Sequence, residues 1–133
     1  MVNQDDNLLT IRSRIEDICT LEAFIHSKKD IPLLERNKIL LITNEIFENI
    51  IQHAKPNNKT IQFKIYQGKV LSFLFLFHSA NFEWFVANVR WIQPYFDPRL
   101  NRYRGLGLKI CYNLSSSIHY RATKTYNAVS VRL

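Results

Sequence analysis

A run of seven residues, Leu71 to Phe77, is apolar except for Ser72. Side chains alternate between the two faces of an extended strand, so this run places phenylalanines on one face and leucines such as Leu74 on the other. The run is too short to span a bilayer. We expect a buried strand that packs against helices on one face. Its other face would be covered by the same chain, by a partner, or by a second subunit in a homodimer.

Hydrophobic patterning and turn residues predict further elements around this strand. Strands are expected in residues 8–12, 60–66, 69–77, 117–121 and 127–133. Helices are expected in residues 13–27, 33–54 and 106–116. The aromatic-rich residues 81–103 should hold a short helix and then a loop. This order predicts an α+β two-layer sandwich in a single domain spanning residues 1–133, with helices on one face of a mixed, mostly antiparallel sheet.

Two local signals define the ends of these elements more closely. Ser13 is followed three residues later by Glu16, which is the spacing of a capping box at the start of the first helix. Gln67-Gly68 lies between two predicted strands and favours a hairpin with a two-residue turn. Both signals are local, so they predict where the backbone turns and not how the elements pack.

The net charge of +7 comes entirely from the last third of the chain. Residues 1–89 contain ten basic and ten acidic side chains, whereas residues 90–133 contain eight basic side chains and one acidic one, Asp97. Such a basic region attracts a nucleotide phosphate, an acidic protein or a nucleic-acid backbone. An ordinary solvated basic surface explains the same charge equally well.

Cysteine and histidine spacing gives no sign of a disulfide framework or a metal cluster. Cys19 and Cys111 lie far apart in the sequence, and the four histidines are scattered. The polar, acidic N-terminal residues do not resemble a signal peptide. We therefore expect a cytoplasmic protein with reduced thiols and no membrane association.

One polar stripe is predicted on the long helix of residues 33–54. Glu45, Asn49 and His53 are four residues apart, so their side chains share one helical face. A carboxylate one turn from a carboxamide suits phosphoryl transfer, because the amide oxygen can bind Mg²⁺ and the carboxylate can orient a hydroxyl group. The alternative is the solvated side of an amphipathic helix, since Glu48 and Gln52 extend the same polar surface.

Two of the three glycines in the chain, Gly105 and Gly107, stand at the predicted entrance to the helix of residues 106–116. Glycine lets the backbone approach a bound group, and the N–H groups at a helix start attract phosphate. Basic residues surround the pair. A glycine-rich entrance that serves only packing is the alternative.

Taken together, the two segments resemble the signature boxes of the GHKL, or Bergerat-fold, ATPase superfamily. Residues 44–54 (NEIFENIIQHA) are similar to its N box, and residues 103–108 (YRGLGL) to its second glycine box. The most similar subgroup is the anti-sigma-factor serine/threonine-protein kinases, which have a histidine kinase-like ATPase fold. The resemblance extends over nearly the whole chain, because the predicted element order and the length are also similar.

This resemblance implies a site for ATP and Mg²⁺. Asn49 would coordinate Mg²⁺, Glu45 would act as the general base for a serine of a protein substrate, and His53 would support the helix end near the nucleotide. Residues 97–104 would form the lid over ATP. The residues that line the triphosphate would be Arg104, Gly105, Leu106, Gly107 and Leu108.

The chain departs from the family pattern directly after the predicted strand of residues 69–77. The family has an Asp-x-Gly-x-Gly box there, whose carboxylate binds the adenine amino group, whereas this chain has His78-Ser79-Ala80-Asn81-Phe82. Ser79 or Asn81 could accept the adenine hydrogen bond. A neutral bond would be weaker than the charge-assisted one by about 1 kcal/mol.

Three functions remain as hypotheses. The first is a regulatory protein that binds ATP·Mg²⁺, captures a sigma factor and phosphorylates a serine on an anti-anti-sigma-type antagonist. The second is a degenerate ATP-binding fold that acts only as a protein-interaction module. Nucleic-acid binding is the third and the weakest, because it rests only on charge and on aromatic residues such as Trp84 and Trp91.

Overall fold

The computed structural model describes residues 6–56, 60–90, 95–99, 102–104, 109, 111 and 113–133. Five of its strands form one sheet in the order β1-β2-β3-β7-β6, and each neighbouring pair is antiparallel. These strands are β1 (Leu8–Arg12), β2 (Thr60–Gln67), β3 (Leu71–Phe77), β6 (Ser117–Ala122) and β7 (Asn127–Arg132). The predicted α+β class is confirmed. Every pair of described strands is antiparallel. The predicted mixed sheet would also contain a parallel pair, and the described strands form none.

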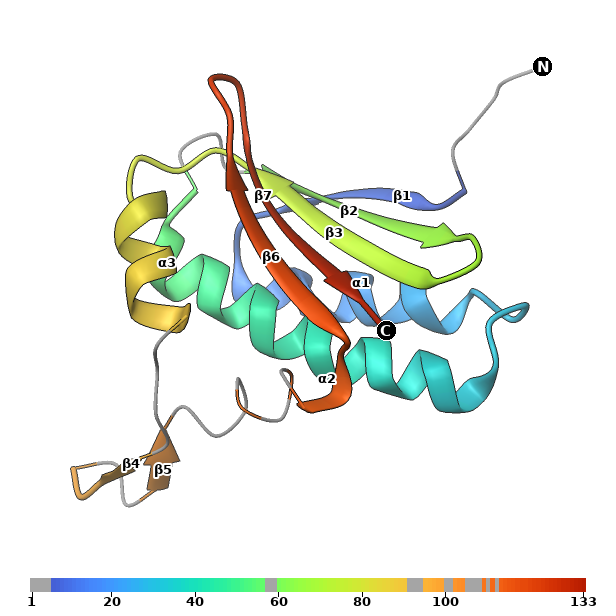
Figure 1. Ribbon diagram of the computed structural model, residues 1–133, viewed down its shortest axis with the longest axis horizontal. Helices are drawn as coiled ribbons and strands as arrows, with labels where there is room; N and C mark the ends of the chain where they lie inside the picture. Colours follow the sequence, from blue (N-terminus) through green and yellow to red (C-terminus); the bar gives the residue numbers. More distant parts are fainter. Residues whose placement is uncertain are drawn as a thin grey trace.

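The helices lie along one face of this sheet, as predicted (Figure 1). In the described residues the α-helices are α1 (Ile18–His26), α2 (Leu33–Asn49) and α3 (Phe82–Arg90). The 3₁₀-helix η1 (Ile15–Asp17) precedes α1, and the π-helix η2 (Ile50–Ala54) continues α2. Figure 1 shows α1 and α2 beneath the sheet and α3 beside the end of η2. Helical backbone is also described at Lys109, Cys111, Asn113 and Leu114.

Aromatic packing joins α2 to the sheet. Phe63, Phe73 and Phe75 are almost completely buried on the face of β2 and β3 that meets the helices. The rings of Phe63 and Phe75 lie with their centroids 5.0 Å apart, and Phe47 of α2 stacks on Phe75 at 6.4 Å. The core therefore lies between α2 and the central strands, with Val129 of β7 beside Phe75 in the register.

The β2–β3 turn differs from the two-residue hairpin that the sequence favoured. Gln67 pairs with Leu71, so Gly68, Lys69 and Val70 form a three-residue connection. Strand β3 consequently begins at Leu71 and not at Lys69. The hydrophobic alternation of β3 against β2 decides the register, and this packing outweighs the preference of a Gly-containing dipeptide for a short turn.

The region between α3 and the last helical residues also differs from the prediction. Residues 82–90 form the expected short helix, but part of the expected loop is a small antiparallel hairpin of β4 (Tyr95–Asp97) and β5 (Arg102–Arg104). Its strands have only three residues each, which is too short to give an alternating hydrophobic pattern in the sequence.

The first helix begins later than predicted, and its start is stabilised by Asp17 instead of Ser13. Arg14 is the N-cap of η1 and makes no side-chain capping bond. The buried Asp17 carboxylate accepts hydrogen bonds from the Arg12 backbone N–H at 2.9 Å and from Arg14 Nε at 2.9 Å. These two hydrogen bonds lower the pKa of Asp17 below its ordinary value, and the bond from Arg14 contributes more than the bond from the Arg12 backbone.

Replacing Asp17 should change how stability depends on pH. Because folding lowers the pKa of Asp17, its carboxylate stabilises the fold above the ordinary carboxyl range and loses this effect as the pH falls through the lowered value. We expect Asp17→Asn to reduce the free energy of urea unfolding at neutral pH, with the difference from the unmodified chain shrinking in acid. The exposed Asp30, changed to Asn, is the control and should show no such trend. A difference that persists undiminished in acid would contradict this account.

Thr43 of α2 is fully buried, and its hydroxyl has no hydrogen-bond partner among the described residues. An unsatisfied buried hydroxyl costs free energy that an apolar group of the same shape does not. We expect Thr43→Val to raise the free energy of unfolding by about 1 kcal/mol, as measured by urea denaturation.

A second threonine provides the matched control for this substitution. The Thr123 hydroxyl accepts a hydrogen bond from the Tyr126 N–H at 3.0 Å and donates one to the Tyr126 carbonyl at 2.9 Å. Thr123→Val makes the same chemical change and should lower stability. Equal effects at the two positions would show that hydrogen-bond satisfaction is not the cause.

Candidate functional site

The three residues of the predicted stripe belong to consecutive helical segments, and all three are half-buried. Glu45 and Asn49 belong to α2, and His53 belongs to η2. The backbone changes from α to π geometry directly after Asn49, and the Lys55 N–H bonds the Ile50 carbonyl at 3.1 Å. Lys55 then ends the helix with φ of 48°. Single π-turns within helices are frequent at functional sites, because they alter which side chains share a face.

His53 contacts α3 through Trp84. The centroids of the two rings are 6.0 Å apart, and their planes are tilted by 45°. The Trp84 side chain remains 55% exposed. Sequence analysis did not place this tryptophan at the stripe, because no local pattern relates residues 31 positions apart. The contact closes the His53 end of the stripe with an aromatic side chain.

The other end of the stripe is partly desolvated. Burial, together with the negative charge of Glu48, raises the pKa of Glu45 above its ordinary value. A carboxylate with a raised pKa is a stronger base than an exposed one. This is the direction required of a group that would accept a proton from a hydroxyl.

Cys111 brings the C-terminal helical residues against α2. Its thiol is 1% exposed and contacts the Ile42 carbonyl oxygen, with 3.9 Å between the sulfur and the oxygen. Burial, followed by the charge of Glu45, raises the pKa of Cys111 to about 12. The thiol therefore stays protonated at neutral pH and acts as a packing group beside Glu45.

Ser79 occupies a hydrogen-bonded junction where three elements end. Its hydroxyl donates to the Ala54 carbonyl at the end of η2 and accepts from the Asn81 N–H at 3.0 Å. Its backbone N–H donates to Asn127 Oδ1 at 2.8 Å, at the start of β7. Ser79 thus ties β3, η2 and β7 together, which is a structural role that sequence analysis did not predict. Asn127 has no sequence signal that would have identified it.

The second predicted segment is described only at its borders. The Arg104 backbone pairs with Tyr95 in the β4–β5 hairpin, and Lys109 is helical and exposed. Gly105, Leu106, Gly107 and Leu108 lie outside the described residues. The meeting of Asn49 with Gly107 around a polyphosphate therefore remains a prediction.

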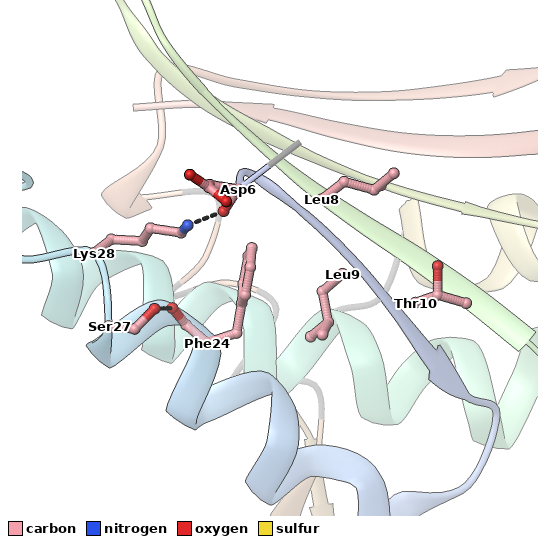
Figure 2. Close-up of a pocket in the computed structure, with 7 residues that line it drawn as sticks. All are labelled: Asp6, Leu8, Leu9, Thr10, Phe24, Ser27 and Lys28. Carbon is pink, nitrogen blue, oxygen red and sulfur yellow. Dashed lines mark hydrogen bonds between the residues drawn. The ribbon is translucent and has the colours of Figure 1, made fainter. Parts of the chain in front are cut away.

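Two of the cavities between described residues have linings that do not include the stripe. The larger, about 690 Å³, lies between β1 and the end of α1 (Figure 2). In it, Lys28 Nζ donates to the Asp6 carbonyl oxygen and lies 4.4 Å from the centre of the Phe24 ring. The smaller, about 280 Å³, lies where β2 begins and β3 ends, and its lining includes His78 and Tyr126. The Lys28 ammonium group therefore already interacts with other residues of this chain.

Metal-ligand geometry, helix hydropathy and comparison with known proteins give no further assignment. No three His, Cys, Asp or Glu side chains cluster as a metal site in the described residues. Within the same residues, none of the helices is both long enough and apolar enough to pass through a membrane. No protein-family model matches the chain, and no curated protein matches it.

The electrostatic account of the stripe can be tested through Glu48. Because its negative charge helps to raise the pKa of Glu45, Glu48→Gln should move that pKa back towards the ordinary glutamate value. Carboxyl NMR titration of Glu45 measures the change. Glu35→Gln, ten residues away on the same helix, should leave the Glu45 titration unaltered. An unchanged titration in Glu48→Gln would mean that burial alone sets the pKa.

Proposed function

We propose that this chain is a two-layer, histidine kinase-like ATP-binding domain that acts as an anti-sigma-factor-like protein serine/threonine kinase. The half-buried stripe of Glu45, Asn49 and His53 carries this proposal. Its three side chains retain the order and spacing of the N box on a helix that lies beneath an antiparallel sheet. The expected partners are a sigma factor and an antagonist protein.

Chain length permits the glycine segment to reach the stripe. Cys111, which contacts α2 at Ile42, is four residues after Gly107, and four residues of chain span at most about 14 Å. Asn49 is seven residues beyond Ile42, which corresponds to about 10.5 Å along a helix. The maximum reach of the chain from Cys111 therefore exceeds the helix length between Ile42 and Asn49, as the proposal requires.

The donor chemistry of the stripe fits a magnesium-bound phosphate. The Asn49 carboxamide offers a neutral oxygen ligand, and it stands one turn from the Glu45 carboxylate. Mg²⁺, when bound, would neutralise phosphate charge that Glu45 and Glu48 would otherwise repel. Glu45, with its raised pKa, would hold the substrate serine hydroxyl and accept its proton.

The Ser79 junction supports the alternative of a non-catalytic interaction module. The Ser79 hydroxyl already donates to Ala54 and accepts from Asn81. The segment that carries a free Asp carboxylate in the family therefore has here a hydroxyl that is hydrogen-bonded within the fold. Base recognition would then depend on weaker contacts than the family's Asp provides. Capture of a partner that is equal with and without ATP would favour this alternative.

Calorimetry with millimolar ATP·Mg²⁺ tests the nucleotide proposal. We expect measurable heat with the unmodified chain and an affinity about tenfold or more lower in Asn49→Ala, because the variant lacks the magnesium ligand. Gln52→Ala is the matched control. It removes an exposed carboxamide from the same helical segment and should bind normally.

Two outcomes would refute nucleotide binding at the stripe. One is the absence of both heat and a thermal shift with the unmodified chain. The other is equal weakening in Asn49→Ala and Gln52→Ala, since only Asn49 belongs to the stripe. Thermal unfolding of each variant without nucleotide shows whether the fold is retained.

A further inference from the structure

The sheet face that turns away from the helices carries basic groups and no acidic ones. None of the five strands of the main sheet contains Asp or Glu. Lys64 and Arg132 alternate with buried positions of β2 and β7 and so belong to this outer face. Arg121 belongs to it because it is in register with Ala128, which lies between buried residues of β7. Arg121 and Arg132 are exposed, and in the described part of the chain neither forms an ion pair.

The centre of the same face is apolar. Leu74 and Leu76 of β3 project from the side opposite to the buried phenylalanines and are only partly covered. Leu8 is in register with Lys64, which is in register with Leu74, so these three side chains form one row across β1, β2 and β3. No helix of the described residues covers this side of the sheet (Figure 1).

Basic side chains border this apolar centre. Arg121 is aligned with Ala128 and Leu76, which places it two strands, or about 10 Å, from the leucine. Lys64 lies in the leucine row, with its Nζ 5.2 Å from the centre of the Tyr66 ring. The face thus combines leucines at its centre with positive charge at its border.

We propose that this outer face docks an acidic amphipathic segment of another protein. Leucines would receive the partner's apolar side chains, and Arg121, Arg132 and Lys64 would pair with its carboxylates. The inference is independent of ATP binding, because none of these residues belongs to the stripe on α2. It identifies a second surface, on the opposite side of the sheet from the proposed nucleotide site.

The same features disfavour two other occupants. Face-to-face pairing with a second copy would bring three cations against three cations without any acid between them. Single-stranded nucleic acid needs neighbouring aromatic rings for stacking. Tyr66 and Tyr126 are instead at opposite ends of the face, with Leu74 and Leu76 between them.

The test uses a synthetic peptide that would form a helix with leucines on one face and glutamates on the other. NMR of the full chain should show its binding through shifts of the Leu74, Leu76 and Arg121 amides. The double variant Arg121→Gln/Arg132→Gln should weaken binding about fivefold, the effect expected of two exposed charge pairs. The control Lys29→Gln/Lys109→Gln removes the same charge from exposed positions outside the sheet and should bind normally.

Several results would overturn the proposal. These are no binding of the peptide, shifts confined to the helices, equal weakening in both double variants, tighter binding of single-stranded DNA to the same amides, and self-association through this face. A peptide of the same composition with a scrambled order should bind more weakly. Asn49→Ala should bind the peptide normally, so failure of ATP binding and failure of this surface are separate results.

Discussion

The packing of α2 on the central strands determines the arrangement of everything else. Phe47 stacks on Phe75, and Phe75 in turn contacts Phe63, so one aromatic cluster joins the helix to two neighbouring strands. All three side chains are fully buried. Each large buried aromatic contributes on the order of 2–3 kcal/mol relative to an exposed position. This cluster determines which face of α2 packs on the sheet, and it therefore restricts rotation of the helix about its own axis.

Once that face is fixed, the position of the polar stripe follows. Ile46, Phe47 and Ile50 are buried, so Glu45 and Asn49 must point to the side of the helix, where they become half-buried. Cys111 and Trp84 cover the two ends of that side. Partial burial is what distinguishes this stripe from a solvated helix surface. It raises the pKa of Glu45, an effect that full exposure would remove.

The sequence predicted the main elements well because their signals are local and repeated. The β3 run, the long helix ending before Pro56 and the final two strands were expected within a few residues of their positions. The capping box at Ser13 and the two-residue β2–β3 turn were predicted wrongly. Asp17 binds the Arg12 backbone and the Arg14 side chain at the start of the helical segment, and the sheet register depends on packing between strands. For the site, periodicity located Glu45, Asn49 and His53 in the long helical segment, where all three are half-buried. It could not locate Trp84 or Cys111, nor reveal that Ser79 is held by Ala54 and Asn127, because these contacts form only when distant segments pack.

Apart from Arg90 at the end of α3, the basic residues of the last third of the chain separate into two groups along the sequence of elements. Arg121, Lys124 and Arg132 lie on or beside β6 and β7, in a sheet whose strands contain no acid. Arg99, Arg102, Arg104 and Lys109 instead belong to the segment between α3 and the final hairpin. A polyphosphate beside Glu45 and Glu48 would be repelled without cations nearby. In the proposed site Mg²⁺ and the second group would supply them, because the first group is on the far side of the sheet layer. The first group is therefore not needed for a nucleotide, and the docking of an acidic segment proposed above would give it a separate role.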